Sequence, residues 1–166
     1  DTTMAVGALR SNAVGFIPSK NLGSASGVIP LMAGVEAATQ SWKKGAVLIN
    51  SSGKIAIAAA DPVAEIVGVA AGPASGVTDA EVLYYPARPG MVFEATFEDE
   101  TNQDHVLVIA NMFANFAVQL DSNGIFYVDE NDTTNTGVVI VGYKDALGTT
   151  RARVFVEFEV DKTVSE

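Results

Sequence analysis

The sequence predicts an all-β protein, a small antiparallel β-barrel or sandwich with an extended N-terminal arm and at most one or two short helices. The first observation is that short β-forming runs between Gly45 and Glu98 are separated by turn residues, about every 8–12 residues. The second is that these breakers leave no room for a helix of usual length. The third is a run at 151–160 whose residues alternate between apolar and polar, as in a half-buried strand.

Five strands are predicted in the central stretch, at 47–50, 54–59, 65–71, 81–85 and 91–97. Each is ended by Gly, Pro, Ser or Asp, which are typical turn residues. The last of the five alternates between apolar and polar residues. Its outer face is predicted to carry Glu94, Thr96 and Glu98.

The second half of the chain contains one ambiguous region and one clear turn. Residues 106–120 fit both a helical face and two buried strands, because periodicity does not separate short apolar runs. We favour a short helix or loop at 111–115, followed by a strand at 116–120. Residues 121–124, Asp-Ser-Asn-Gly, predict a hairpin, since Asn-Gly tolerates the positive φ angles of tight turns.

Three further strands are predicted after that hairpin, at 125–128, 137–143 and 151–160. In the last of them the inward face is predicted to run from Ala152 to Val160. Phe155 is the one apolar residue on the opposite face, which makes it a candidate subunit contact.

Residues 1–40 differ in composition from the predicted β-domain at 41–166. They are poor in charge, and their apolar residues follow no 2-residue or 3.6-residue period, so no regular element is predicted at 1–39. Two interpretations stay open. The segment is an arm that becomes ordered on a neighbouring protein, or it is an irregular cover on its own domain. Candidate contacts with a partner protein or with another subunit are Leu9, Phe16, Ile17, Pro18, Leu22, Ile29, Trp42 and Phe155, although Trp42, the single tryptophan, is more typical of a core or boundary anchor.

Composition excludes several functional classes. The chain has 166 residues, enough for one domain, with 10 Lys and Arg against 20 Asp and Glu. The resulting net charge of −10 disfavours a nucleic-acid partner. The absence of cysteine excludes disulfides and cysteine-ligated zinc.

The chain is unusually apolar, with 48% hydrophobic and 18% charged residues and a mean hydropathy of +0.25. Its most apolar window, residues 55–72, contains Asp61, Pro62 and Glu65, so no membrane span is predicted. We expect the apolar surface to be covered by other subunits or by a partner.

Candidate catalytic and metal-binding residues are few. His105 is the only histidine, so a histidine cluster for a metal cannot form. The acidic loop at 129–132 fails the EF-hand pattern, because the sixth and twelfth places hold Thr134 and Ile140, although a looser oxygen-ligand calcium site stays open. We expect no enzyme, with no catalytic residue, cofactor or metal.

The order of segments resembles a known family. The segments are GAVLI at 45–49, GKIAIA at 53–58, IVGVA at 66–70, MVFEA at 91–95, YVDENDTTNT at 127–136, VIVGY at 139–143 and RVFVEF at 153–158. Over about 45–158 this pattern is similar to the head decoration, or cement, proteins of tailed bacteriophages.

The resemblance implies a small β-barrel-like domain without catalytic residues. It also implies a virion protein that binds the major capsid protein on the outer surface of the head, as a homotrimer at threefold or quasi-threefold sites. An N-terminal arm would lie on the capsid or on an adjacent subunit. Two alternatives stay open, namely another phage structural subunit of the tail or capsid, and a surface adhesin or glycan-binding module.

Overall fold

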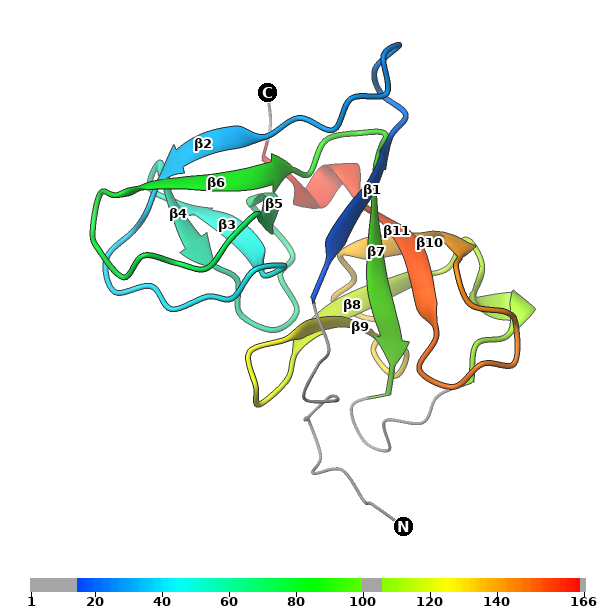
Figure 1. Cartoon of the computed structure of the whole chain (residues 1–166). Helices are drawn as coiled ribbons and strands as arrows, with labels where there is room; N and C mark the ends of the chain where they lie inside the picture. Colours follow the sequence, from blue (N-terminus) through cyan, green and yellow to red (C-terminus); the bar gives the residue numbers. More distant parts are fainter. Residues whose placement is uncertain (1–14, 100–105, 165–166) are drawn as a thin grey trace.

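The computed structural model describes residues 15–99 and 106–164, which form two β-sheets that lie side by side (Figure 1). The larger sheet has six strands in the order β1-β7-β11-β10-β8-β9. The smaller sheet has five strands in the order β2-β6-β5-β3-β4. The predicted all-β class is therefore confirmed.

The strands of the larger sheet are β1 (Ile17–Asn21), β7 (Met91–Glu98), β8 (Asn115–Leu120), β9 (Phe126–Asp129), β10 (Val138–Tyr143) and β11 (Arg153–Phe158). Those of the smaller sheet are β2 (Met32–Val35), β3 (Val47–Ser51), β4 (Lys54–Ile57), β5 (Ile66–Ala70) and β6 (Glu81–Pro86). Within the described part of the chain, the helical segments are two short 3₁₀ turns, η1 (Ile109–Asn111) and η2 (Val160–Lys162).

The larger sheet closes into a five-stranded barrel through β7, the longest of the described strands. One edge of β7 is occupied by β11, where Phe155 lies opposite Glu94. The other edge is shared end to end by β1, which pairs with residues 91–94, and by β9, which pairs with Phe97 and Glu98. Because β9 also pairs with β8, the short parallel contact between β7 and β9 completes the ring.

The two ends of the smaller sheet are joined at Glu36, just after β2. Glu36 forms a parallel bridge with Ile55 of β4, and the N–H of Ala37 donates to the Ile55 carbonyl at 2.9 Å. The Glu36 carboxylate is buried and accepts hydrogen bonds from the Ser75 hydroxyl and from the N–H of Gly76. The backbone at Glu36 therefore joins β2 to β4, and its side chain attaches both strands to the loop that follows β5.

Buried apolar side chains from both sheets form one contiguous core. Phe16, just before β1, stacks on Phe158 with ring centroids 5.5 Å apart, and Phe93 meets Phe158 edge-on at 5.4 Å. Trp42 is buried in the same core, and its Nε1 donates to the Gly72 carbonyl at 3.0 Å. The prediction of Trp42 as a core anchor is confirmed.

The strands predicted from residue 45 onward are all found, with bounds that differ by at most two residues at either end. Residues 106–120 form η1 followed by β8, which resolves the ambiguity in favour of a short helical turn and a strand, although the turn lies at 109–111 and not at the predicted 111–115. The predicted hairpin is also found. Gly124 has a φ of +80°, and the Asp121 carboxylate accepts from the N–H groups of Asn123 and Ile125, each at 2.8 Å.

The prediction of no regular element at 1–39 was wrong for β1 and β2. Both strands are short. In β1 the buried and exposed positions do not alternate, and in β2 they alternate but all four residues, Met-Ala-Gly-Val, are apolar or glycine, so the sequence shows no apolar–polar period. They also contain Pro18 and Gly34, which are poor strand formers. Pairing with β7 and β6 overrides these local preferences.

Two predicted strand faces need correction. Val160 was predicted to face inward, but it is exposed and begins η2. The reason is that the chain leaves the barrel there and crosses to β5, where the N–H of Val164 donates to the Ile66 carbonyl. Glu98 was predicted on the outer face, but it is buried, because β9 covers that end of β7. Its carboxylate pairs with the Arg151 guanidinium at 3.1 Å.

We expect Gly68→Ala to destabilise the fold by about 3 kcal/mol or more. A Cβ at Gly68 would lie 2.0 Å from the backbone carbonyl oxygen of Tyr85, so β5 and β6 would have to separate. Gly72→Ala is the matched control, because a Cβ there meets no atom within 4 Å, and its free energy of unfolding should change by less than about 0.5 kcal/mol. Urea denaturation measures both, and equal stability of the two variants would contradict the β5–β6 packing.

Candidate functional site

The loop between β1 and β2, residues 22–31, is the candidate functional site, and we call it the β1–β2 loop. Figure 1 shows it projecting beyond both sheets. Leu22, Val28 and Leu31 are 69%, 67% and 51% exposed on it. No charged residue occurs in the sequence between Lys20 and Glu36. The loop therefore presents a neutral, partly apolar surface in a chain that carries a net charge of −10.

Hydrogen bonds fix the shape of the β1–β2 loop. The side-chain amide of Asn21 donates to the Val28 carbonyl at 2.7 Å, and its oxygen accepts from the N–H of Gly23 at 3.1 Å. One side chain thus connects the two ends of the loop. The N–H of Leu22 donates to the Gly90 carbonyl at 2.8 Å, which attaches the loop to the corner before β7. A surface fixed in this way loses little conformational entropy when a partner binds.

A cleft of about 360 Å³ lies beneath the β1–β2 loop. Its walls are the loop itself and the corner between β6 and β7, including Arg88, Pro89 and Met91. Arg88 is the one charged residue in this lining. A partner that covers the loop therefore meets a mixed polar and apolar lining with one nearby cation.

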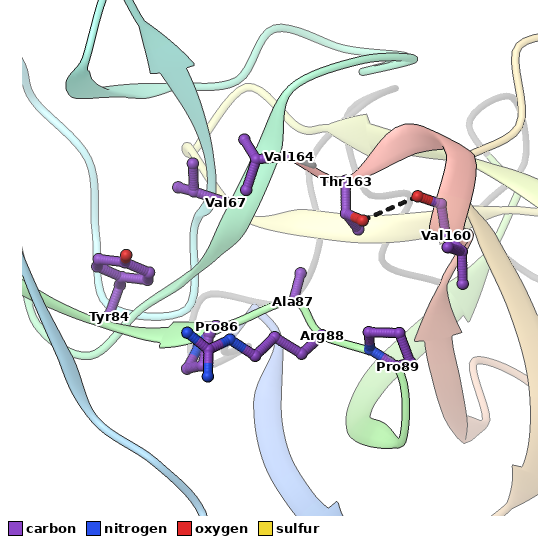
Figure 2. Close-up of a pocket in the computed structure, with 9 residues that line it drawn as sticks. All are labelled: Val67, Tyr84, Pro86, Ala87, Arg88, Pro89, Val160, Thr163 and Val164. Carbon is purple, nitrogen blue, oxygen red and sulfur yellow. Dashed lines mark hydrogen bonds between the residues drawn. The ribbon is translucent and has the colours of Figure 1, made fainter. Parts of the chain in front are cut away.

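A second cleft, of about 350 Å³, lies between β5, β6 and the C-terminal segment (Figure 2). Figure 2 shows Val67 and Val164 on one side of this cleft and Ala87, Arg88 and Pro89 on another. The Thr163 hydroxyl donates to the Val160 carbonyl at 2.9 Å. The lining contains no carboxylate, histidine or cysteine, so it offers no general base for a nucleophile.

A network of charged side chains covers the outer face of the barrel. Arg153 Nε donates to Glu94 Oε1 at 2.8 Å, and Lys144 Nζ lies 3.3 Å from the same oxygen. Burial by itself raises the pKa of the Glu94 carboxyl, but the hydrogen bonds and charges of Arg153 and Lys144 outweigh burial and hold that pKa below its ordinary value of 4.5. The network joins β7, β11 and the turn after β10.

The acidic loop at 129–132 uses its oxygens for local turns. The Asp129 carboxylate accepts from the N–H of Asn131 at 3.0 Å, and Asp132 accepts from the N–H and hydroxyl of Thr134 at 3.0 and 2.7 Å. The Asn131 side chain donates to Asp99 at 2.7 Å. Among the residues that the structure describes, no group of three or more His, Cys, Asp or Glu side chains is arranged to hold a metal ion.

The structure separates the predicted contact residues into two groups. Phe16 and Trp42 are buried in the core, and Ile29 packs against it, so their side chains stabilise the fold. Ile17 and Leu22 are exposed, while Pro18 and Phe155 are half-buried. Phe155 lies on the outer face of the barrel, with Lys20 Nζ 5.8 Å from its ring centroid. The remaining predictions, for Leu9 and His105, fall outside the described residues.

Sequence reasoning missed the exposed residues Val28 and Leu31, and also Val108, Ile109 and Phe113 near η1. One signal could have found both groups. Residues 21–35 and 106–120 are the stretches around them, and each stretch contains apolar residues without a single charge. A buried strand has the same composition, so only the structure shows that these side chains face outward.

A comparison with protein-family models finds no match to this chain, and neither does a comparison with curated proteins. A search of the described residues for a helix long and apolar enough to cross a membrane also finds none.

The charged network predicts a specific pH dependence of stability. The pKa of Glu94 is lowered in the folded state, so the ionised carboxylate adds to the free energy of unfolding. This contribution is complete above about pH 4.5 and is lost as the pH falls through the folded-state pKa. We expect Glu94→Gln to lower the free energy of unfolding by about 1–2 kcal/mol at pH 7. This deficit should shrink as the pH falls below 4.5.

Urea denaturation between pH 3 and 7 measures this difference. The control is Glu81→Gln, an exposed carboxylate on β6, which should leave stability nearly unchanged at every pH. A Glu94→Gln deficit that stays constant down to the lowest pH would contradict the assignment.

Proposed function

We propose that the protein is a structural component of a bacteriophage head, which binds the outer surface of the capsid as trimers and stabilises the expanded shell. It acts there as a binding protein and not as an enzyme. The order of segments from 45 to 158 supports this proposal through its resemblance to head decoration proteins, and the barrel is compatible with it. The observation that carries it is the rigid, uncharged and apolar β1–β2 loop.

The β1–β2 loop is suited to many weak contacts. Burying an exposed leucine or valine side chain completely contributes about 1.5–3 kcal/mol. Leu22, Val28 and Leu31 together offer on the order of 4 kcal/mol per copy, before the cost of association is subtracted. One loop therefore binds weakly, and a trimer with three loops binds much more tightly through multivalency.

The proposed mechanism is mechanical. Each trimer bridges neighbouring capsomers, so its contacts form only when the capsid surfaces have the spacing of the expanded shell. Binding to that state and not to the unexpanded state stabilises the expanded shell by mass action. The absence of charge on the loop allows the acidic protein to approach the capsid without bringing carboxylates into the contact.

Sedimentation with expanded, undecorated capsids of the phage that encodes the chain tests this function. We expect the wild-type protein to bind, and the double variant Leu22→Ser with Val28→Ser to bind at least about tenfold more weakly. The matched control is Val77→Ser with Val63→Ser, which removes exposed apolar side chains elsewhere and should bind like wild type.

Failure of the wild-type protein to bind expanded capsids would overturn the proposed function. Equal binding by the loop variant would show that another surface makes the contact. Assembly of the purified protein by itself into tubes or shells would instead indicate a tail or capsid subunit.

A further inference from the structure

A second exposed apolar group lies near η1, on the barrel. It consists of Val108, Ile109 and Phe113, which are 46%, 65% and 75% exposed, and we call it the η1 knob. An exposed phenylalanine beside two exposed aliphatic residues is unusual on a solvated surface. Aromatic side chains are common anchors of protein interfaces.

The η1 knob is rigidly held. Leu107 is fully buried on one side of it, and Asn111 is buried between its exposed residues. The Asn111 side-chain oxygen accepts from the N–H of Val108 at 2.9 Å. The N–H of Phe113 donates to the Ile140 carbonyl at 2.8 Å, which attaches the knob to β10. The exposure of these side chains therefore does not come from a loose loop.

Phe113 adopts an unfavourable backbone conformation. Its φ is +61°, in the left-handed region that glycine and asparagine tolerate and that a bulky side chain disfavours. A phenylalanine that is 75% exposed at such a position gains little from packing within its own chain. Strain of this kind is concentrated at functional positions, where another interaction offsets it.

The same chain contains an apolar pocket of a size that fits a phenyl ring. The pocket has a volume of about 180 Å³, and an apolar cavity of about 150 Å³ is known to hold benzene. Its lining comes from β1, β5, β6 and the turn before β3, and includes Phe16, Ile17, Pro18, Ala70, Tyr85 and Lys44. Lys44 is the one charged residue in that lining, and a lysine is attracted to the face of an aromatic ring.

The knob and the pocket lie in different parts of the molecule. In Figure 1 the yellow-green segment with the knob is at the right-hand edge, whereas the start of β1, at the pocket, lies between the two sheets. We propose that Phe113 of one copy enters the Phe16–Tyr85 pocket of the next copy, which makes a head-to-tail contact between copies of this chain.

The charges at the knob and at the pocket allow a second copy to be the occupant, although the whole chain is acidic. Copies with a net charge of −10 repel each other over most of their surfaces. The knob lies in a stretch, 106–120, without any charged residue, and the pocket contributes only a lysine. Neither of these two surfaces contains a carboxylate, so the contact brings no two negative charges together.

A head-to-tail contact between unlike surfaces generates a ring when the rotation between copies closes, and a filament when it does not. Only the number of copies in the ring, three, rests on the proposed function. The contact itself requires no capsid, so it can be tested on the purified protein alone.

The test uses two variants that remove opposite halves of the contact. Phe113→Asn removes the ring but keeps a residue that tolerates the left-handed conformation, so its thermal midpoint should not fall below that of wild type. Ile17→Gln places an amide in the wall of the pocket. The control is Val77→Ser, which changes an exposed apolar residue outside both surfaces.

Sedimentation velocity over a wide concentration range gives the state of association. We expect wild type and Val77→Ser to associate, and each of the two interface variants to associate at least about tenfold more weakly. An equal mixture of Phe113→Asn and Ile17→Gln should restore dimers, because the first variant keeps the pocket and the second keeps the ring.

A wild-type protein that stays monomeric at all concentrations would overturn the inference, and so would a mixture of the two variants that fails to form dimers. Association of Ile17→Gln as strong as that of wild type would also contradict the inference, because it would indicate contact between two knobs. Capsid binding by the wild-type protein is a separate readout, so a wild type that binds capsids but stays monomeric in solution overturns this inference and leaves the proposed function standing.

Discussion

Closure of the barrel and attachment of the N-terminal segment both require β7 to pair along both of its edges. One edge is covered by β11, and the other is divided between β1 and β9. The part held by β9 closes the barrel, and the part held by β1 attaches the N-terminal segment to it. Glu98 is buried where β9 closes on β7, and Arg151 compensates its charge. A strand with only one partner could not perform both tasks.

This division of one edge explains how residues 15–36 are held. They begin against the barrel as β1, project as the β1–β2 loop and end at Glu36, which joins the two ends of the smaller sheet. The loop is thus attached to both sheets, and Asn21 closes it from within. Rigid attachment and lack of charge are the two properties that suit this loop to the proposed capsid contact. The η1 knob has the same two properties on the barrel.

The sequence predicts most of the fold because its strong signals are local. Alternation in β7 and β11, and the Asn-Gly turn after β8, depend only on neighbouring residues. It does not predict β1 and β2, which contain Pro18 and Gly34 and form because β7 and β6 offer free edges. Nor does it predict which apolar residues are exposed. Phe16 and Phe113 are both phenylalanines in uncharged surroundings, yet one stacks in the core and the other faces solvent.

Amide hydrogen exchange of the free protein tests whether the N-terminal segment from residue 15 is part of the folded unit, as the pairing of β1 with β7 requires. The N–H groups of Phe16, Leu22 and Glu36 donate to the carbonyls of Gly45, Gly90 and Ala80 at 2.9, 2.8 and 2.9 Å. We expect these three amides to be protected to the same order as those of β7. Exchange at the rate of an unstructured peptide would show that the segment becomes ordered only on a partner, and it would contradict this account.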